Sequence, residues 1–285
     1  MLNIGPYRVY THIVDYFKLD GGSMFGSVPK VLWERYLPAD SLNRIPLCSR
    51  VMIIESPGRK ILIDTGCGLK WDEKRRAQYD IKSALNNYSE DSILSKRISG
   101  VTDVVLTHLH FDHAGGVSYF NGSVLKLSFP DAKHYVSKEN FDQAMNPGQR
   151  ERGSYFPEHL SILQESDLVL TKDEFEILPG IRFYTLYGHT RGMQIVIIEE
   201  GGMAKVAFLA DLVPTHHHLQ LPFIMGYDMC AEKTLAERLR FYPRFLQDET
   251  VLIFEHDRDC AAGILGLSKD KYMLEKQIVL DCELA

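Results

Sequence analysis

Several features that mark other protein classes are scarce or missing in this sequence. It has no run of about 18 apolar residues, so no helix is expected to cross a membrane. Its five cysteines, at positions 48, 67, 230, 260 and 282, include no C-x-x-C pair. An odd number without such a pair argues against a disulfide framework. The thiols are therefore expected to be reduced, as in a cytoplasmic protein.

An excess of positive charge and a targeting segment are also missing. The formal net charge is −6, which argues against a nucleic-acid partner bound through a broad basic face. Residues 1–7 lack a basic segment followed by a long apolar run, so no signal peptide is expected. The chain is 45% hydrophobic, which is enough for a large core. It has no repeat, low-complexity segment or clear linker, so we predict a single domain over 1–285.

The most informative stretch is residues 107–116, which read Thr-His-Leu-His-Phe-Asp-His-Ala-Gly-Gly. His108, His110, Asp112 and His113 fall within six positions, and imidazole and carboxylate are common ligands of zinc and related metals. The apolar run before them predicts a buried strand, and Gly115-Gly116 predicts a turn. A single histidine is usually a packed or surface residue, but four ligand-type residues at one strand end are hard to assign to packing.

Three later apolar runs also end in ligand-type residues. Residues 181–187 precede His189, residues 206–210 precede Asp211, and residues 251–255 precede His256. Each alone is compatible with an ordinary turn. Ligands at successive strand ends gather along one edge of a sheet, however, so we expect these three near the 108–113 segment.

The full set of ligand types suits two divalent ions. One ion would take His108, His110 and His189, the other would take Asp112, His113 and His256, and Asp211 would bridge them. A water shared by two ions is acidified and becomes a nucleophile near neutral pH. Asp64, which follows the apolar run 60–63, is the candidate acceptor for a ligand's second ring nitrogen. These ligands accept Zn, Mn, Fe or Co, and zinc is our first expectation.

These motifs resemble the metallo-β-lactamase superfamily from about residue 50 to 258. The similarity includes the 107–116 motif, Asp-Thr-Gly at 64–66, Gly-His-Thr at 188–190, the later Asp211 and Glu-His-Asp at 255–257. The resemblance implies an α/β fold, a four-layer αβ/βα sandwich, with the two-metal site at one edge. It implies the same ligand assignment, and a metal-bridging hydroxide that attacks a small ester, lactone or phosphoester.

The residues of the 107–116 motif are similar to those of the quorum-quenching lactonases and the methyl-parathion-hydrolase-like enzymes. Lactonases carry a tyrosine shortly after the bridging Asp, whereas residues 212–215 here read Leu-Val-Pro-Thr. Tyr227 is our candidate replacement, which makes Asp112, Asp211 and Tyr227 the expected catalytic residues. True β-lactamases have Cys or His where Asp211 stands, and flavin-diiron proteins replace the second histidine, here His110, with Glu.

Two other functions remain open at this point. One is a metal-binding carrier or sensor without hydrolytic activity, and the other is iron-dependent oxygen chemistry on the same fold. The expected partner is a small-molecule substrate, neither a nucleic acid nor a membrane, and a homodimer is the assembly to test. We expect His218 and Phe25 to form opposite pocket walls, and His216 and His217 to be solvated surface residues.

Apolar patterns and turn signals also predict the secondary structure. Strands are expected over 7–15, 50–55, 60–63, 101–107, 133–136, 168–170, 175–178, 181–186, 193–199, 205–209, 250–254 and 271–280. Helices are expected near 30–35 in a long 21–46 loop, within 69–98 with a start at 89–92, and over 137–145, 157–164 and 232–246. In the last helix, Leu235, Leu239, Tyr242 and Leu246 are predicted to face the core, and Pro243 predicts a kink or break.

Overall fold

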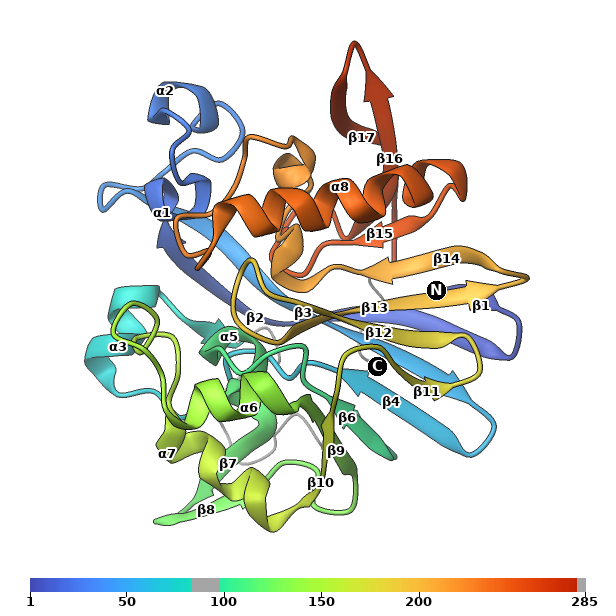
Figure 1. Ribbon diagram of the computed structural model, residues 1–285. Helices are drawn as coiled ribbons and strands as arrows, with labels where there is room; N and C mark the ends of the chain where they lie inside the picture. Colours follow the sequence, from blue (N-terminus) through green and yellow to red (C-terminus); the bar gives the residue numbers. More distant parts are fainter. Residues whose placement is uncertain (84–97, 281–285) are drawn as a thin grey trace. The chain divides into compact units, whose positions relative to one another are not determined.

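The computed structural model describes residues 1–83 and 98–280, and these form two compact units (Figure 1). The first unit contains Met1–Phe17 and Ser49–Lys172, and the second contains Lys18–Cys48 and Asp173–Leu280. Each unit is built on a mixed β-sheet with helices. The single-domain organisation over 1–285 stays a prediction. The helix start predicted at 89–92 lies outside the described residues.

The first sheet has the strand order β1-β2-β3-β4-β6-β9-β10, with β5 paired to β2. Its strands are β1 (Leu2–Ile4), β2 (Tyr7–Asp20), β3 (Arg44–Ser56), β4 (Arg59–Ile63), β5 (Lys82–Ser83), β6 (Asp103–Val105), β9 (Lys133–Ser137) and β10 (Asp167–Thr171). The strands predicted at 50–55 and 60–63 are confirmed as parts of β3 and β4, which pair antiparallel, and Gly58 takes a positive φ of 75° in the turn between them. Strands β4, β6, β9 and β10 run parallel, so their carboxyl ends lie along one edge.

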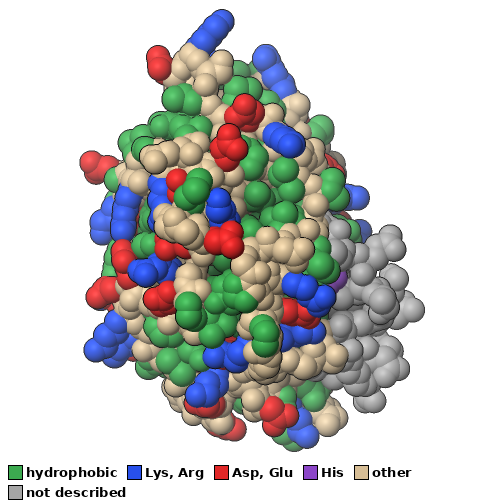
Figure 2. Space-filling view, turned by 90° about the vertical axis from the view of Figure 1, so that its right-hand side faces the viewer, with side chains coloured by type: hydrophobic (Ala, Val, Ile, Leu, Met, Phe, Trp, Pro, Cys, Tyr) green, Lys and Arg blue, Asp and Glu red, His purple; other side chains and the backbone are tan. Residues whose placement is uncertain are grey.

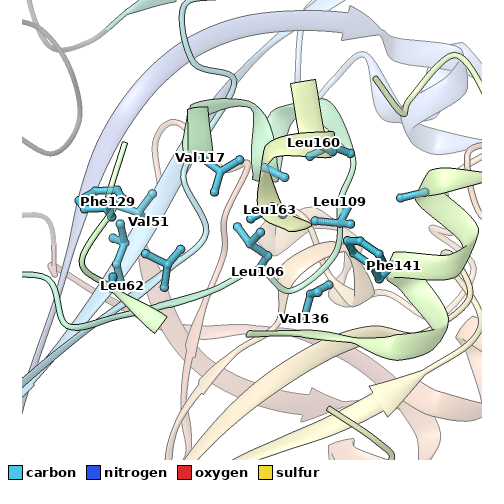
Figure 3. Packing of buried hydrophobic residues seen from close by; sticks show 14 of the residues in the cluster. Val51, Leu62, Leu106, Leu109, Val117, Phe129, Val136, Phe141, Leu160 and Leu163 are labelled. Carbon is cyan, nitrogen blue, oxygen red and sulfur yellow. The ribbon is translucent and has the colours of Figure 1, made fainter. Parts of the chain in front are cut away.

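Short helices accompany this sheet, and all but the first contribute residues to the hydrophobic core of the unit. They are α3 (Glu73–Tyr79), α5 (Phe111–Ala114), η2 (Gly115–Val117), α6 (Lys138–Met145), α7 (Pro157–Leu160) and η3 (Ser161–Glu165), beside a small hairpin of β7 (Ser118–Asn121) and β8 (Val124–Leu127). Figure 3 shows Leu106 and Val136 from the strand side meeting Phe141 of α6 and Leu163 of η3. The predicted helix start at Ser137 is confirmed, since its hydroxyl accepts the Asn140 N–H at 3.0 Å.

The second sheet lies wholly in the second unit and has the order β11-β12-β13-β14-β15-β16-β17. Its strands are β11 (Phe175–Leu178), β12 (Ile181–Leu186), β13 (Met193–Glu200), β14 (Met203–Phe208), β15 (Val251–Ile253), β16 (Ala262–Ser268) and β17 (Lys271–Ile278). Only β14 and β15 pair parallel. The predicted strands are present, and the late strand is at the sheet edge as expected. The sequence patterns missed β16.

Helix α8 (Ala231–Gln247) packs against β16, and of its predicted inner face only Tyr242 is confirmed as buried. Thr234, Arg238, Phe241, Tyr242 and Phe245 are buried, whereas Leu239 is 44% exposed. The fully buried Arg238 explains the rotation, because its guanidinium donates to the carbonyls of Leu212 at 2.9 Å and Phe223 at 2.8 Å. The helix is continuous across Pro243, so the predicted break does not occur.

The early loop of the second unit contains more structure than expected. Helix α1 (Gly21–Phe25) was not predicted, α2 (Lys30–Trp33) was, and β3 already begins at Arg44. None of the helices in the described ranges is both long and apolar enough to cross a membrane. On the face in Figure 2, Lys and Arg side chains are interspersed with Asp and Glu, so that face carries no broad basic patch.

Candidate metal centre

Four of the candidate ligands occupy equivalent positions at strand ends. His108, His189, Asp211 and His256 each lie three residues after the last residue of β6, β12, β14 and β15, respectively. In the second unit, the parallel pair Phe208↔Ile253 places the ends of β14 and β15 at the same sheet edge. Each candidate ligand therefore lies on a three-residue extension of its strand, beyond the sheet edge where such sites form.

The first unit holds one set of ligand-type side chains, which we call the first ligand group: His108, His110, Asp112 and His113. All four are buried. The Nε2 atom of His108 lies 3.1 Å from Nδ1 of His110. The backbone between them is fixed, because the Leu109 N–H donates to Asn140 Oδ1 at 2.8 Å. Helix α5 then turns Asp112 and His113 away from the strand direction.

Asp64 orients this group from the end of β4. Its carboxylate accepts the Thr107 N–H at 2.7 Å and the Thr107 hydroxyl at 2.6 Å. The same carboxylate lies 3.1 Å from Nδ1 of His113. Because that hydroxyl donates to Asp64, its oxygen accepts from Nδ1 of His108 at 3.1 Å. The predicted role of Asp64 as acceptor for a ring nitrogen of a candidate ligand agrees with its contact to His113, and Thr107 is an orienting residue that sequence reasoning missed.

The glycine pair after the first ligand group is needed for close backbone packing. A Cβ at Gly115 would collide with the carbonyl of Cys67, and one at Gly116 would collide with the carbonyl of Thr65. The Gly116 N–H donates to the Gly66 carbonyl at 3.0 Å. The turn after β4 thus lies directly against the turn after the ligand motif.

The second unit holds the second ligand group, which consists of His189, Asp211 and His256. Asp211 faces both histidines, with Oδ2 3.0 Å from His189 Nε2 and Oδ1 3.0 Å from His256 Nε2. Behind them, His189 Nδ1 lies 2.9 Å from Asp228 Oδ1, and His256 Nδ1 lies 2.9 Å from the Cys48 carbonyl oxygen. The residue before Asp211, Ala210, takes a strained φ of 44°.

The charges around His189 favour its protonated form in the absence of a cation. Burial lowers the pKa of His189, but the carboxylates of Asp211 and Asp228 outweigh this and raise that pKa to about 10. A divalent ion would replace the proton between His189 and Asp211, because neutral imidazole is the ligating form.

The arrangement of donor atoms fits divalent metal ions. His108, His113, His189 and His256 each direct Nδ1 to an oxygen acceptor, which leaves Nε2 with its lone pair. Two ligand atoms that share one ion at about 2.0–2.1 Å lie about 3.3 Å apart in a tetrahedral site. The observed spacings of 3.0 and 3.1 Å within each group are close to that value.

Two predictions about the pocket are not supported by the structure. His218 cannot be a wall exposed to ligand, because it is fully buried, with Nδ1 2.8 Å from the Thr215 hydroxyl and Nε2 2.8 Å from the Met24 carbonyl. Its ring stacks on Phe25 at 4.7 Å, and Phe25 is also fully buried. These two residues therefore join α1 to η5 (His216–Leu219) in the core of the second unit.

The neighbouring histidines are also less solvated than predicted. His216 Nδ1 lies 2.5 Å from the buried carboxylate of Asp257, and the His217 ring lies 4.9 Å from the Tyr36 ring. Both side chains are half-buried, so neither is a fully solvated surface residue. Tyr227, also half-buried, directly precedes Asp228, which sequence reasoning missed because nothing in its loop marks it as a partner of His189.

Comparison with known proteins agrees with this geometry. The family model described as "Metallo-beta-lactamase superfamily" matches residues 46–253, which is more than half of the chain. The chain belongs to the metallo-beta-lactamase superfamily. The 108–113 motif, His189 and Asp211 lie within the matched residues, and His256 lies three positions beyond them.

Several curated proteins are similar to this chain over more than half of its length. An N-acyl homoserine lactonase of Bacillus thuringiensis subsp. kurstaki is 27% identical over 176 residues, covering 59% of this chain and 63% of the relative. The chain thus spans less than two thirds of the length of such lactonases, and 57% of one from Bacillus cereus. A probable metallo-hydrolase of Mycobacterium bovis is 25% identical, covering 83% of this chain and 82% of the relative.

Solved structures identify the fold. A probable metal-dependent hydrolase of Staphylococcus aureus superimposes with a TM-score of 0.83 at 26% identity, covering 98% of this chain and 100% of the other. A dizinc quorum-quenching lactonase gives 0.77 at 18% identity, covering 98% and 97%. The predicted α/β class and the αβ/βα sandwich of the metallo-beta-lactamase superfamily are confirmed.

Proposed function

We propose that the two ligand groups together hold two divalent ions in a hydrolase site. His108, His110 and His189 would bind the first ion, and Asp112, His113 and His256 would bind the second. The observation that carries this proposal is the position of Asp211, whose two oxygens each lie 3.0 Å from a different histidine. Because we assign those histidines to different ions, Asp211 is built to bridge them.

The residues of this chain prepare the site before any substrate binds. Two bound ions would supply an acidified water as nucleophile and would polarise the substrate's carbonyl or phosphoryl oxygen. Asp64 and Asp228 keep His113 and His189 in the ligating orientation, and the Cys48 carbonyl does the same for His256. Asp112 and Asp211, both nearly buried, set the negative charge of the site. Zinc is the ion that we propose.

A small ester or lactone is the substrate class that we propose first, and a phosphoester is second. The names of the N-acyl homoserine lactonase relatives support a lactone. Tyr227 remains our candidate for orienting the substrate in place of the tyrosine missing from 212–215. Its segment is fixed beside a ligand, because Asp228 contacts His189 and the Met229 N–H donates to the His189 carbonyl at 2.9 Å.

Metal analysis and a substrate panel test the proposal together. Elemental analysis of protein loaded with zinc should give about two ions per chain. The panel should include lactones, carboxylic esters, thioesters and phosphoesters, and at least one class should be hydrolysed. Asp211→Asn should abolish turnover and lower the metal content, whereas Asp142→Asn, on an exposed part of α6, should change neither.

Each contrary result has a distinct meaning. One ion per chain with full activity would contradict the bridging role of Asp211. Two ions per chain with no hydrolysis across the panel would favour a metal carrier or sensor. Native iron with oxygen consumption would favour oxygen chemistry.

A further inference from the structure

Helix α3 places a tyrosine next to the first ligand group. The ring of Tyr79 stacks on Phe111 with centroids 5.1 Å apart and an interplanar angle of 27°. Phe111 is the residue between His110 and Asp112 in the ligand motif. The Trp71 ring lies 5.2 Å from Phe111 and 6.0 Å from Tyr79, so Tyr79 belongs to an aromatic cluster beside the ligands.

The backbone holds Tyr79 in this position from both sides. Helix α3 begins at an Asp72 cap, whose carboxylate accepts the Arg75 N–H at 2.7 Å. It ends at Asp80, which takes the left-handed conformation, and the Ile81 N–H donates back to the Arg76 carbonyl at 3.1 Å. Strand β5 then pairs with β2, so the ring is positioned before a ligand arrives.

The hydroxyl of Tyr79 is a donor without a protein acceptor in the described ranges 1–83 and 98–280. Its side chain is half-buried, and its hydroxyl is not among the fully buried polar atoms that lack a partner. Burial and the nearby charge of Asp112 raise the pKa of Tyr79, against a smaller opposing effect of Arg75. The hydroxyl therefore keeps its proton at neutral pH and can only donate or accept hydrogen bonds there.

We infer that the Tyr79 hydroxyl donates a hydrogen bond to an oxygen of the substrate, beside an apolar group that packs on Trp71 and Phe111. This assignment rests on the proposed hydrolase function. The substrate class is a carbonyl compound with an apolar substituent. In its hydrolysis, the water oxygen forms a bond to the carbonyl carbon and the bond to the leaving oxygen breaks. One proton of the water ends on the leaving oxygen and the other is released to solvent, while Tyr79 keeps its O–H bond. Tyr79, in addition to Tyr227, is thus a substrate-contacting tyrosine.

The Tyr79→Phe variant removes the donor and keeps the stacking ring. With the best ester or lactone from the panel, we expect kcat/KM to fall at least tenfold, which is the scale for losing one donor to a reacting oxygen. Metal content and Tm should stay at the wild-type values. Tyr119→Phe on β7 is the matched control and should keep full activity.

Binding of hexanoate gives a readout that does not depend on turnover. Its carboxylate presents an acceptor for Tyr79 and its chain presents an apolar group for Trp71. Titration monitored by tryptophan fluorescence should show a Kd at least fivefold higher for zinc-loaded Tyr79→Phe than for wild type. Trp33, the only other tryptophan, is stacked on Phe25 and supplies a constant background.

The two readouts separate this assignment from the proposed function. If the substrate panel is inactive but hexanoate binds more weakly to Tyr79→Phe, hydrolysis is wrong and the Tyr79 assignment stands. If substrates are hydrolysed and Tyr79→Phe matches wild type in kcat/KM and in hexanoate affinity, the Tyr79 assignment is overturned. The absence of both hydrolysis and hexanoate binding in wild type would overturn it as well.

Discussion

The Nδ1 atom of His189 lies 2.9 Å from Oδ1 of Asp228, and both side chains are buried. A carboxylate can only accept here, so Nδ1 carries the proton and Nε2 points its lone pair towards Asp211. The contact joins residues 39 positions apart in the sequence. It fixes which nitrogen of His189 is available to a metal ion.

Removal of this carboxylate should weaken metal binding rather than the fold. For Asp228→Ala we expect metal affinity to fall about 10–100-fold, which is typical when the partner of a ligating histidine is lost. Asp228→Asn should lose less, because its amide oxygen can still accept from Nδ1. Competition with a chromophoric chelator measures the affinity, with Asp142→Ala as the control. Equal affinity for Asp228→Ala and wild type would contradict the orienting role.

Asp64 should matter for stability as well as for the site. Asp64→Ala leaves the buried Thr107 N–H without its acceptor and places alanine at a φ of 60°. We expect the free energy of unfolding to fall by about 2–4 kcal/mol, measured by urea denaturation. Asp64→Asn should lose about half as much, since asparagine tolerates this φ and can still accept one hydrogen bond. A loss below about 0.5 kcal/mol for Asp64→Ala would be inconsistent with this account.

Acid should destabilise the protein through His134 on β9. Burial lowers the pKa of this fully buried histidine to about 4, so the unfolded state binds its proton more tightly than the folded state. Stability from His134 is therefore complete above about pH 6.5 and is lost as the pH falls towards 4. Between pH 7 and 4.5, wild type should lose on the order of 2 kcal/mol more than His134→Leu.

The difference between these two proteins isolates the histidine. Asp15 has the opposite effect, because burial raises its pKa to about 7 and its contribution to stability falls as the pH rises towards that value. This contribution is common to wild type and His134→Leu, and it cancels in the comparison of their urea midpoints. Parallel pH profiles for the two proteins would show that His134 contributes nothing.

The orientation of α8 can be tested by a pair of truncations. Phe245 is fully buried, so Phe245→Ala should reduce the free energy of unfolding by about 3–5 kcal/mol. Leu239 is 44% exposed, so Leu239→Ala should change that free energy by less than about 0.5 kcal/mol. Chemical denaturation measures both values. A larger loss for Leu239→Ala would restore the face predicted from the sequence.

The strand-end positions of the candidate metal ligands were predictable, because apolar runs precede them in the sequence and strand ends of a sheet meet along an edge. His189, Asp211 and His256 all have this local signal. Asp228 has no such signal, and its contact with His189 depends on the path of the whole 213–230 loop. His218 looked like a pocket residue, but its partner, the Met24 carbonyl, is 194 positions away.

The face of α8 shows a different limit of sequence reasoning. Leucines at 235, 239 and 246 suggested an apolar stripe, yet the buried stripe includes the cationic Arg238. The carbonyl oxygens of Leu212 and Phe223 accept hydrogen bonds from Arg238 and make its burial favourable. The positions of these oxygens depend on the tertiary structure and are not visible in the sequence of the helix. A cytoplasmic location, a homodimer and the identity of the ion stay predictions.

The contact between the glycine pair and the turn after β4 has an evolutionary meaning. Any side chain at Gly115 or Gly116 would collide with the carbonyl oxygen of Cys67 or Thr65, so any single substitution there should destabilise the packing of the two turns. A mutational library scored only for soluble expression should be depleted at both positions, although neither glycine has a group that could take part in chemistry. If these two glycines do not vary among related sequences, the reason would be the close packing of the two turns. We would then expect both glycines to be retained in relatives that no longer bind metal ions.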